Sequence, residues 1–135
     1  MYLIDTNIIS ELTKPGRNTG AVKWISAQEN LVFSVISFHE LRYGINRAKQ
    51  EQKKRLESWW NEFLSYSPEF LPIDLKISNI GSLIRSKSES EGVPLTLADS
   101  LIAATAIHHS KILVTRNIAD FAKCGLGLLN PFEMI

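Results

Sequence analysis

A chain of 135 residues is the size of one ordinary domain, and its 44% apolar and 21% charged residues are typical of a soluble globular protein. The single cysteine excludes an internal disulfide, and no apolar run reaches the roughly 18 residues of a membrane helix. The net charge of +1 decides little about nucleic-acid binding, which depends on local patches. We therefore expect one domain over 1–135, without a signal peptide or membrane span, in the cytoplasm.

Short apolar runs alternate with amphipathic stretches along the chain. In chain order they predict a strand at 2–5, helices at 7–14 and 20–29, a strand at 31–36, a helix over 38–64 bent near Gly44, a strand at 70–73, a helix ending near 91, a helix at 97–109, a strand at 111–115, a helix at 118–122 and a strand near 126–129. The strand runs are apolar on both faces, which is typical of a covered parallel sheet. The pattern predicts an α/β fold: a three-layer α/β/α domain with a four- to five-stranded, mainly parallel sheet.

Four acids lie at or near the points where predicted strands give way to helices. Asp5 ends the first strand, and we place Glu40, Asp99 and Asp120 each in the first turn of a helix. Sites in open α/β sheets form beyond the carboxyl ends of the strands. The four carboxylates are therefore candidates for one shared site, provided that the helix carrying Asp99 also begins at that edge.

Helix capping is an alternative explanation for three of these acids. The pairs Ser37 and Glu40, Thr96 and Asp99, and Asn117 and Asp120 all have the spacing of a capping box. Acids in a first turn also complement the helix dipole. Asp5 differs because it precedes its helix, where it competes with Thr6 and Asn7 for the N-cap position. Capping alone does not require the acids to share one end of the sheet.

Convergence of four carboxylates would be unfavourable unless raised pKa values or bound cations relieved the repulsion. Hard cations with oxygen ligands fit best, namely Mg²⁺, or Mn²⁺ in its place. The histidines and Cys124 lack the spacing of another metal site. A metal held by acids at a strand edge suits phosphoryl transfer, and the sequence carries no P-loop or G-x-S-x-G motif that would indicate a different chemistry.

The same residues carry a family resemblance. The segments YLIDTNIIS, FSVISFHELRYGI, LTLADSLIAATAI, ILVTRNIADF and GLGLLNPF resemble, in order and spacing, the PIN domain of VapC-type toxins, the ribonuclease halves of bacterial toxin–antitoxin pairs. The resemblance extends from Tyr2 to Phe132. It implies Mg²⁺-dependent endonucleolytic cleavage of RNA, a small antitoxin that places a basic side chain among the acids, and a homodimer.

The resemblance also implies roles for individual residues. By position, Asp5 and Asp99 match the principal metal ligands, Glu40 matches the second acid and Asp120 the fourth and most variable one. The small polar residues that match the family's supporting positions are Thr6, Thr115 and Asn117.

Two other features have alternative readings. The basic run 46–55, with Arg42 nearby, is either a surface that binds the RNA backbone or a solvated helix face. Arg116 is a candidate phosphate contact because it lies at the same strand edge as the acids. We expect Trp59 to pack inside, and Trp60 to be buried or to contact a partner.

Other functions remain open at this point. A receiver domain would need a lysine where Thr115 and Arg116 stand, and an aspartate-nucleophile phosphatase would need an acid at Asn7. A catalytically inactive PIN-like binding module and a nuclease acting on DNA are the alternatives that the sequence does not exclude.

Overall fold

The computed structural model describes residues 1–134. Its strands are β1 (Tyr2–Ile4), β2 (Val32–Ser34), β3 (Glu69–Leu71), β4 (Ile112–Val114) and β5 (Leu128–Leu129). Its α-helices are α1 (Thr6–Ser10), α2 (Thr19–Ser26), α3 (Val35–Asn46), α4 (Gln50–Ser65), α5 (Leu75–Ser90), α6 (Leu97–His108) and α7 (Ile118–Phe121), and the 3₁₀ helices are η1 (Glu11–Thr13) and η2 (Pro131–Glu133). None of the described helices is both long and apolar enough to cross a membrane.

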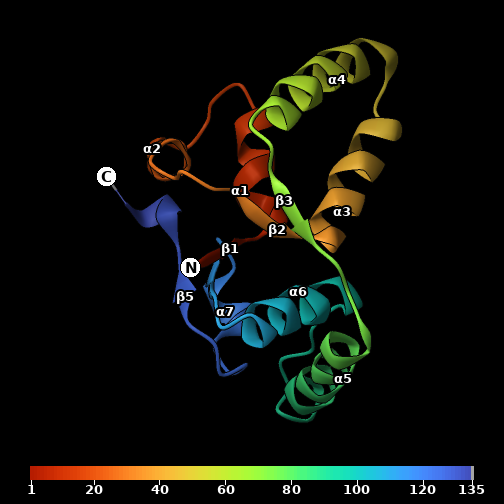
Figure 1. The fold of residues 1–135 in the computed structure, drawn as a ribbon, viewed down its shortest axis with the longest axis vertical. Coiled ribbons are helices and arrows are strands. Elements are labelled where there is room, and N and C mark those ends of the chain that lie inside the picture. Colours follow the sequence, from red (N-terminus) through yellow and green to blue (C-terminus); the bar gives the residue numbers. More distant parts are fainter. Residues whose placement is uncertain (135) are drawn as a thin grey trace.

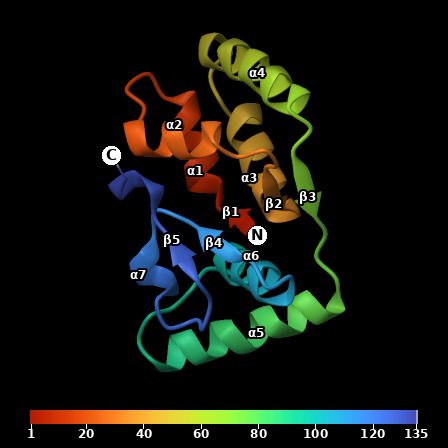
Figure 2. The ribbon, with the colours of Figure 1, turned by 60° about the vertical axis from the view of Figure 1, so that its left-hand side comes forward.

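The strands form a parallel sheet in two hydrogen-bonded parts. One part has the order β1-β4-β5 and the other pairs β2 with β3, and every pairing is parallel. Strands β1 and β2 lie side by side and join the parts, so β1 is the central strand of five. Figures 1 and 2 show α1 to α4 on one side of the strands and α5 to α7 on the other. The predicted three-layer α/β/α fold with a parallel sheet is confirmed.

Alternate residues of the central strands pack into two separate hydrophobic cores, one on each face of the sheet. Ile4, Phe33 and Val114 pack with α1, α3 and α4, whereas their neighbours Leu3 and Leu113 pack with α6 and α7. Successive side chains of a strand point to opposite faces, so a run that is buried on both faces has to be apolar throughout. The site must therefore form at a strand end, where polar residues follow the buried runs.

The prediction for the start of α3 is wrong. Strand β2 ends at Ser34, whose hydroxyl accepts a hydrogen bond from the Ile36 N–H at 3.1 Å and caps α3. The helix thus begins earlier than expected, and Ser37 lies inside it rather than at its cap. Glu40 is accordingly in the second turn, so the capping-box explanation for Glu40 is excluded.

The predicted bend in the long helical region is also misplaced. Gly44 lies within α3, and the break between α3 and α4 falls at residues 47–49.

Trp60 is buried against α3, which confirms the packing alternative for this residue. Arg42 bridges the two helices, since its Nη1 lies 2.6 Å from Glu57 Oε1.

Candidate functional site

Asp5 occupies the carboxyl end of the central strand. Its own N–H donates to the Val114 carbonyl at 2.9 Å, which extends the β1–β4 ladder by one bond. Its carboxylate caps α1 by accepting from the Thr6 N–H at 2.7 Å, and it also accepts from the Thr115 hydroxyl at 2.8 Å. The side chain is only 4% exposed. Asp5 is therefore both the N-cap of α1 and a carboxylate held rigidly at the sheet edge.

Glu40 is brought to Asp5 through the neighbouring residue. The Thr6 hydroxyl donates to Glu40 Oε1 at 2.6 Å and lies 2.8 Å from the Ser37 hydroxyl. A threonine hydroxyl has one proton, so Ser37 must donate to Thr6 while Thr6 donates to Glu40. This relay fixes α3 against α1 and orients the Glu40 carboxylate.

Asp99 stands in the first turn of α6, as predicted. The Thr96 hydroxyl caps the helix by accepting from the Asp99 N–H at 3.0 Å. Within the described residues the Thr96 N–H makes no return bond to the Asp99 carboxylate, so only half of a capping box is formed. The half-buried carboxylate of Asp99 is left without a backbone partner.

Asp120 is exposed and lies in the first turn of α7. Its capping box is not formed either, because the Asn117 side chain makes no capping bond. The Asn117 N–H instead donates to the Thr115 hydroxyl at 3.0 Å. Asn117 thus contacts the site through its backbone.

The pKa values show that the acids share one electrostatic environment. Burial first, and then the charges of Asp99 and Glu40, raise the pKa of Asp5 to about 6, against the hydrogen bonds from Thr115 and Thr6 that lower it. Burial also raises the pKa of Asp99, followed by the charge of Glu40 and, more weakly, that of Asp120. Asp5, Glu40 and Asp99 are therefore close enough for their charges to interact, and Asp120 adds a weaker effect on Asp99, which capping alone does not explain.

Asn7 is a residue of this site that sequence reasoning missed. Its Nδ2 lies 3.3 Å from both Asp5 Oδ2 and Thr115 Oγ1, and its Oδ1 accepts from the Arg116 N–H at 3.2 Å. Asn7 therefore locks the loop after β4 onto the carboxylate that follows β1. The available signal was its position two residues after Asp5, on the same turn.

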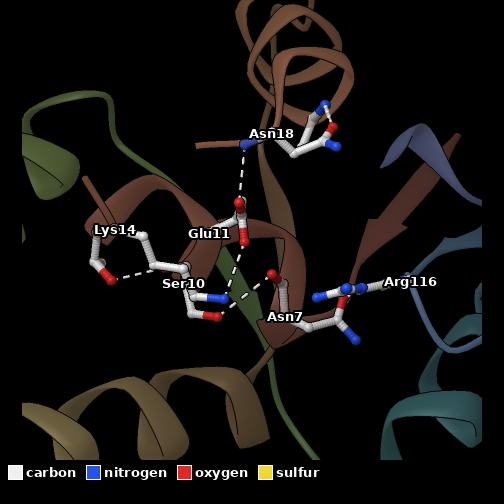
Figure 3. A network of polar contacts seen from close by, with 8 residues as sticks. Asn7, Ser10, Glu11, Lys14, Asn18 and Arg116 are labelled. Atoms are coloured by element: carbon white, nitrogen blue, oxygen red, sulfur yellow. Dashed lines mark hydrogen bonds and ion pairs between the residues drawn. The ribbon is translucent and has the colours of Figure 1, made fainter. Parts of the chain in front are cut away.

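A second polar network adjoins the acids, and Figure 3 shows it next to Asn7 and Arg116. Glu11 is 6% exposed, accepts from the Asn18 N–H at 2.9 Å and lies 3.1 Å from Lys14 Nζ. Burial acts to raise the pKa of Glu11, but the Asn18 N–H and the charges of Lys14 and Arg116 hold it below its ordinary value. Glu11 and Asp5 are thus both buried carboxylates, but the surroundings of Glu11 stabilise its charged form, whereas those of Asp5 favour its protonated form.

Arg116 is exposed at the same strand edge, as predicted. Its guanidinium carbon lies 4.9 Å from the centre of the Phe132 ring, so the side chain rests on η2. Of the basic run, Arg55 donates to the Thr13 carbonyl at 2.8 Å, which leaves this side chain engaged with the protein itself.

Metal-free protein should become more stable relative to Asp5→Asn as the pH falls. The pKa of Asp5 is raised from 3.8 to about 6 in the folded state, so the folded state takes up a proton before the unfolded state does. The stabilisation is complete below about pH 4, is lost as pH rises through 6, and is on the order of 3 kcal/mol. Melting curves of both proteins in chelator from pH 8 to 4.5 test this. A difference in melting temperature that stays constant with pH would contradict it.

Comparisons with known proteins identify the family to which the chain belongs. The PIN domain family model matches residues 2–125. The VapC ribonuclease Y4jK of Sinorhizobium fredii is 34% identical, with 98% of this chain and 99% of that protein covered. The crystal structure of FitAcB from Neisseria gonorrhoeae superimposes with a TM-score of 0.89 at 32% identity, covering 99% of this chain and 100% of that one.

A toxin–antitoxin complex from Klebsiella pneumoniae superimposes with a TM-score of 0.74 at 29% identity, covering 99% of this chain and 100% of that one. The family model and the ribonuclease each cover nearly the whole chain. The chain therefore belongs to the PIN domain family, among its VapC-type toxins.

Proposed function

We propose that this toxin is an endoribonuclease that depends on Mg²⁺, or on Mn²⁺ in its place. The observation that carries the proposal is that Asp5, Glu40 and Asp99 lie within reach of one another's charge at one sheet edge, with Asp120 near Asp99, and that the pKa values of Asp5 and Asp99 are raised. Anions crowded in this way are stabilised by a cation. The relatives that carry ribonuclease in their names support RNA as the substrate.

The donor set fits magnesium. Among residues 1–134, no three His, Cys, Asp or Glu side chains lie close enough together to bind a metal ion by themselves. Mg²⁺ keeps several waters and is usually bound through one or two carboxylates, so a complete cage is not needed. We assign Asp5 and Asp99 as the principal ligands, with Glu40 and Asp120 completing the acidic site.

The remaining residues orient these groups. Thr115 and Asn7 hold Asp5 Oδ2, and Thr6 holds Glu40 Oε1, so neither carboxylate needs to reorganise when the cation binds. We assign Arg116, which is exposed at the same strand edge, as a candidate phosphate contact. When bound, the cation would polarise the scissile phosphate and lower the pKa of the attacking water.

The direct test is incubation of the purified protein with a panel of single-stranded RNAs and matching DNAs, with Mg²⁺ or with chelator. We expect cleavage of RNA that requires the cation. Cleavage of DNA alone would make the protein a deoxyribonuclease. A protein that cleaves neither substrate in Mg²⁺ or Mn²⁺ would be an inactive binding module, and the proposal would be wrong.

We also propose an antitoxin as the natural partner, as the similarity to a toxin–antitoxin complex suggests. In the absence of metal the acidic site favours another cation, such as a basic side chain of the partner. A peptide from the antitoxin with one arginine or lysine should therefore inhibit cleavage, and the same peptide with glutamine there should be at least about tenfold weaker. Titration of cleavage with both peptides measures this, and equal inhibition would contradict it.

The homodimer implied by the family resemblance remains a proposal.

A further inference from the structure

A groove begins at the acidic site and follows α3. One wall is a face of α3 and the other is the start of α6, and the groove has a volume of about 510 Å³, within the range of ligand sites. Its lining includes Glu40, Tyr43, Gly44 and Arg47 of α3 and Leu97 and Leu101 of α6.

The order of these side chains along α3 matches a nucleotide strand. Glu40 belongs to the acidic site, Tyr43 lies one turn further on and is 60% exposed, and Arg47 lies at the far end. Seven residues of helix span about 10 Å, the length of roughly three stacked nucleotides. A strand with its scissile phosphate at the acids would thus meet an aromatic ring first and a cation next.

The groove also has the chemistry of a single-strand site. Such sites combine aromatic rings, on which bases stack, with cations for the phosphates. The Tyr43 ring has the parallel His39 ring 6.3 Å away and the Arg47 guanidinium carbon 5.4 Å from its centre, so a base would stack there in place of one of these side chains. Arg47 forms no ion pair within residues 1–134. Leu97, 58% exposed, offers an apolar surface on the opposite wall.

We propose that this groove between α3 and α6 binds single-stranded RNA next to the scissile phosphate, with one base on Tyr43 and an adjoining phosphate at Arg47. The inference rests on the proposed ribonuclease function and adds a binding subsite to it. Because stacking does not distinguish among bases, the subsite should contribute affinity more than sequence preference.

Gly44 provides a way to block the groove. An added Cβ there meets no atom within 4 Å, so the position faces open space. Leucine has a higher helix propensity than glycine, and Gly44→Leu should therefore fill the groove while maintaining or raising the melting temperature. Tyr43→Ala is the complementary variant, since it removes an exposed ring and should leave the fold intact. Tyr66→Ala is the matched control, because Tyr66 is 68% exposed at the end of α4, outside the groove.

The experiment measures anisotropy of a fluorescein-labelled 12-nucleotide single-stranded RNA at low salt in chelator, where the RNA stays intact. Loss of one stacked base should weaken binding by about fivefold to a hundredfold in Tyr43→Ala. Gly44→Leu should weaken binding similarly, Tyr66→Ala should match wild type, and Arg47→Gln should lower the salt dependence by about one phosphate contact.

The inference is overturned if wild type fails to bind the RNA, or if the Tyr43 and Gly44 variants bind it as wild type does. It is equally overturned if those variants alter only self-association or antitoxin binding, since the groove would then be a protein interface. RNA binding that depends on the groove, without cleavage in Mg²⁺, would reject the ribonuclease proposal and retain the subsite. Cleavage with unchanged kcat/KM in both groove variants would reject the subsite and retain the ribonuclease.

Discussion

Asp5→Asn should reduce RNA cleavage by at least about 100-fold, the usual effect of removing a preorganised group that acts on charge in the transition state. The change keeps the shape of the side chain and an oxygen to accept from the Thr6 N–H, but removes the negative charge that would hold the cation. In chelator the removal of a costly buried charge opposes the loss of the bonds that Asp5 Oδ2 accepts from Thr115 and Asn7, so the variant should melt close to wild type at pH 8. Cleavage rates in Mg²⁺ and melting curves in chelator measure the two effects.

Glu11→Gln is the matched control for this experiment. It also neutralises a buried carboxylate, and it lies on the chain close to Asp5, but Glu11 is stabilised as an anion by the Asn18 N–H and Lys14. Glu11→Gln should therefore lower the melting temperature and leave cleavage within a few-fold of wild type. Wild-type cleavage by Asp5→Asn, or an equal loss in both variants, would remove the basis for assigning Asp5 a specific role.

The position of the acids at one sheet edge could be predicted because it follows from topology. Strands that are apolar on both faces must be parallel and covered, and the first polar residue after each then falls at a common edge. Asp5, after β1, follows this rule directly. Asp99 does not follow a strand, so its arrival at the same edge could not be derived, and it depends on how α6 packs under the sheet.

The contacts that orient the acids could not be predicted because they join distant parts of the chain. Thr6 bonds to Glu40, 34 residues away, and Thr115 bonds to Asp5, 110 residues away. The start of α3 was mispredicted for a local reason, since Ser34 and Ser37 are both suitable N-caps and it is Ser34, at the end of β2, that caps the helix. Choosing Ser34 moves Glu40 into the second turn, where its carboxylate can reach the Thr6 hydroxyl.

Asp99→Asn should abolish most of the stabilisation that Mg²⁺ gives to wild type. A ligand that binds only the folded state stabilises by RT ln(1 + [L]/Kd), about 1.4 kcal/mol at a tenfold excess over Kd. For a chain of this size that corresponds to a rise in melting temperature of roughly 5 °C. In chelator, neutralising Asp99 should leave stability unchanged or raise it, since burial and Glu40 already raise its pKa. Four melting curves at low salt, for two proteins with chelator or Mg²⁺, give both quantities.

Asp74→Asn supplies the capping control for this comparison. Asp74 is the N-cap of α5, accepts from the Ile77 N–H at 2.9 Å, and has a pKa lowered mainly by that bond. Its neutralisation should reduce stability slightly and by the same amount with and without Mg²⁺, because it removes a favourable charge at a helix start. If Asp99 only capped α6, Asp99→Asn would behave in the same way, costing on the order of 0.5 to 1 kcal/mol while keeping the full Mg²⁺ increment. That outcome would mean that the metal binds elsewhere. If instead only Asp99→Asn loses the rise in melting temperature with Mg²⁺, Asp99 binds the metal and does more than cap α6.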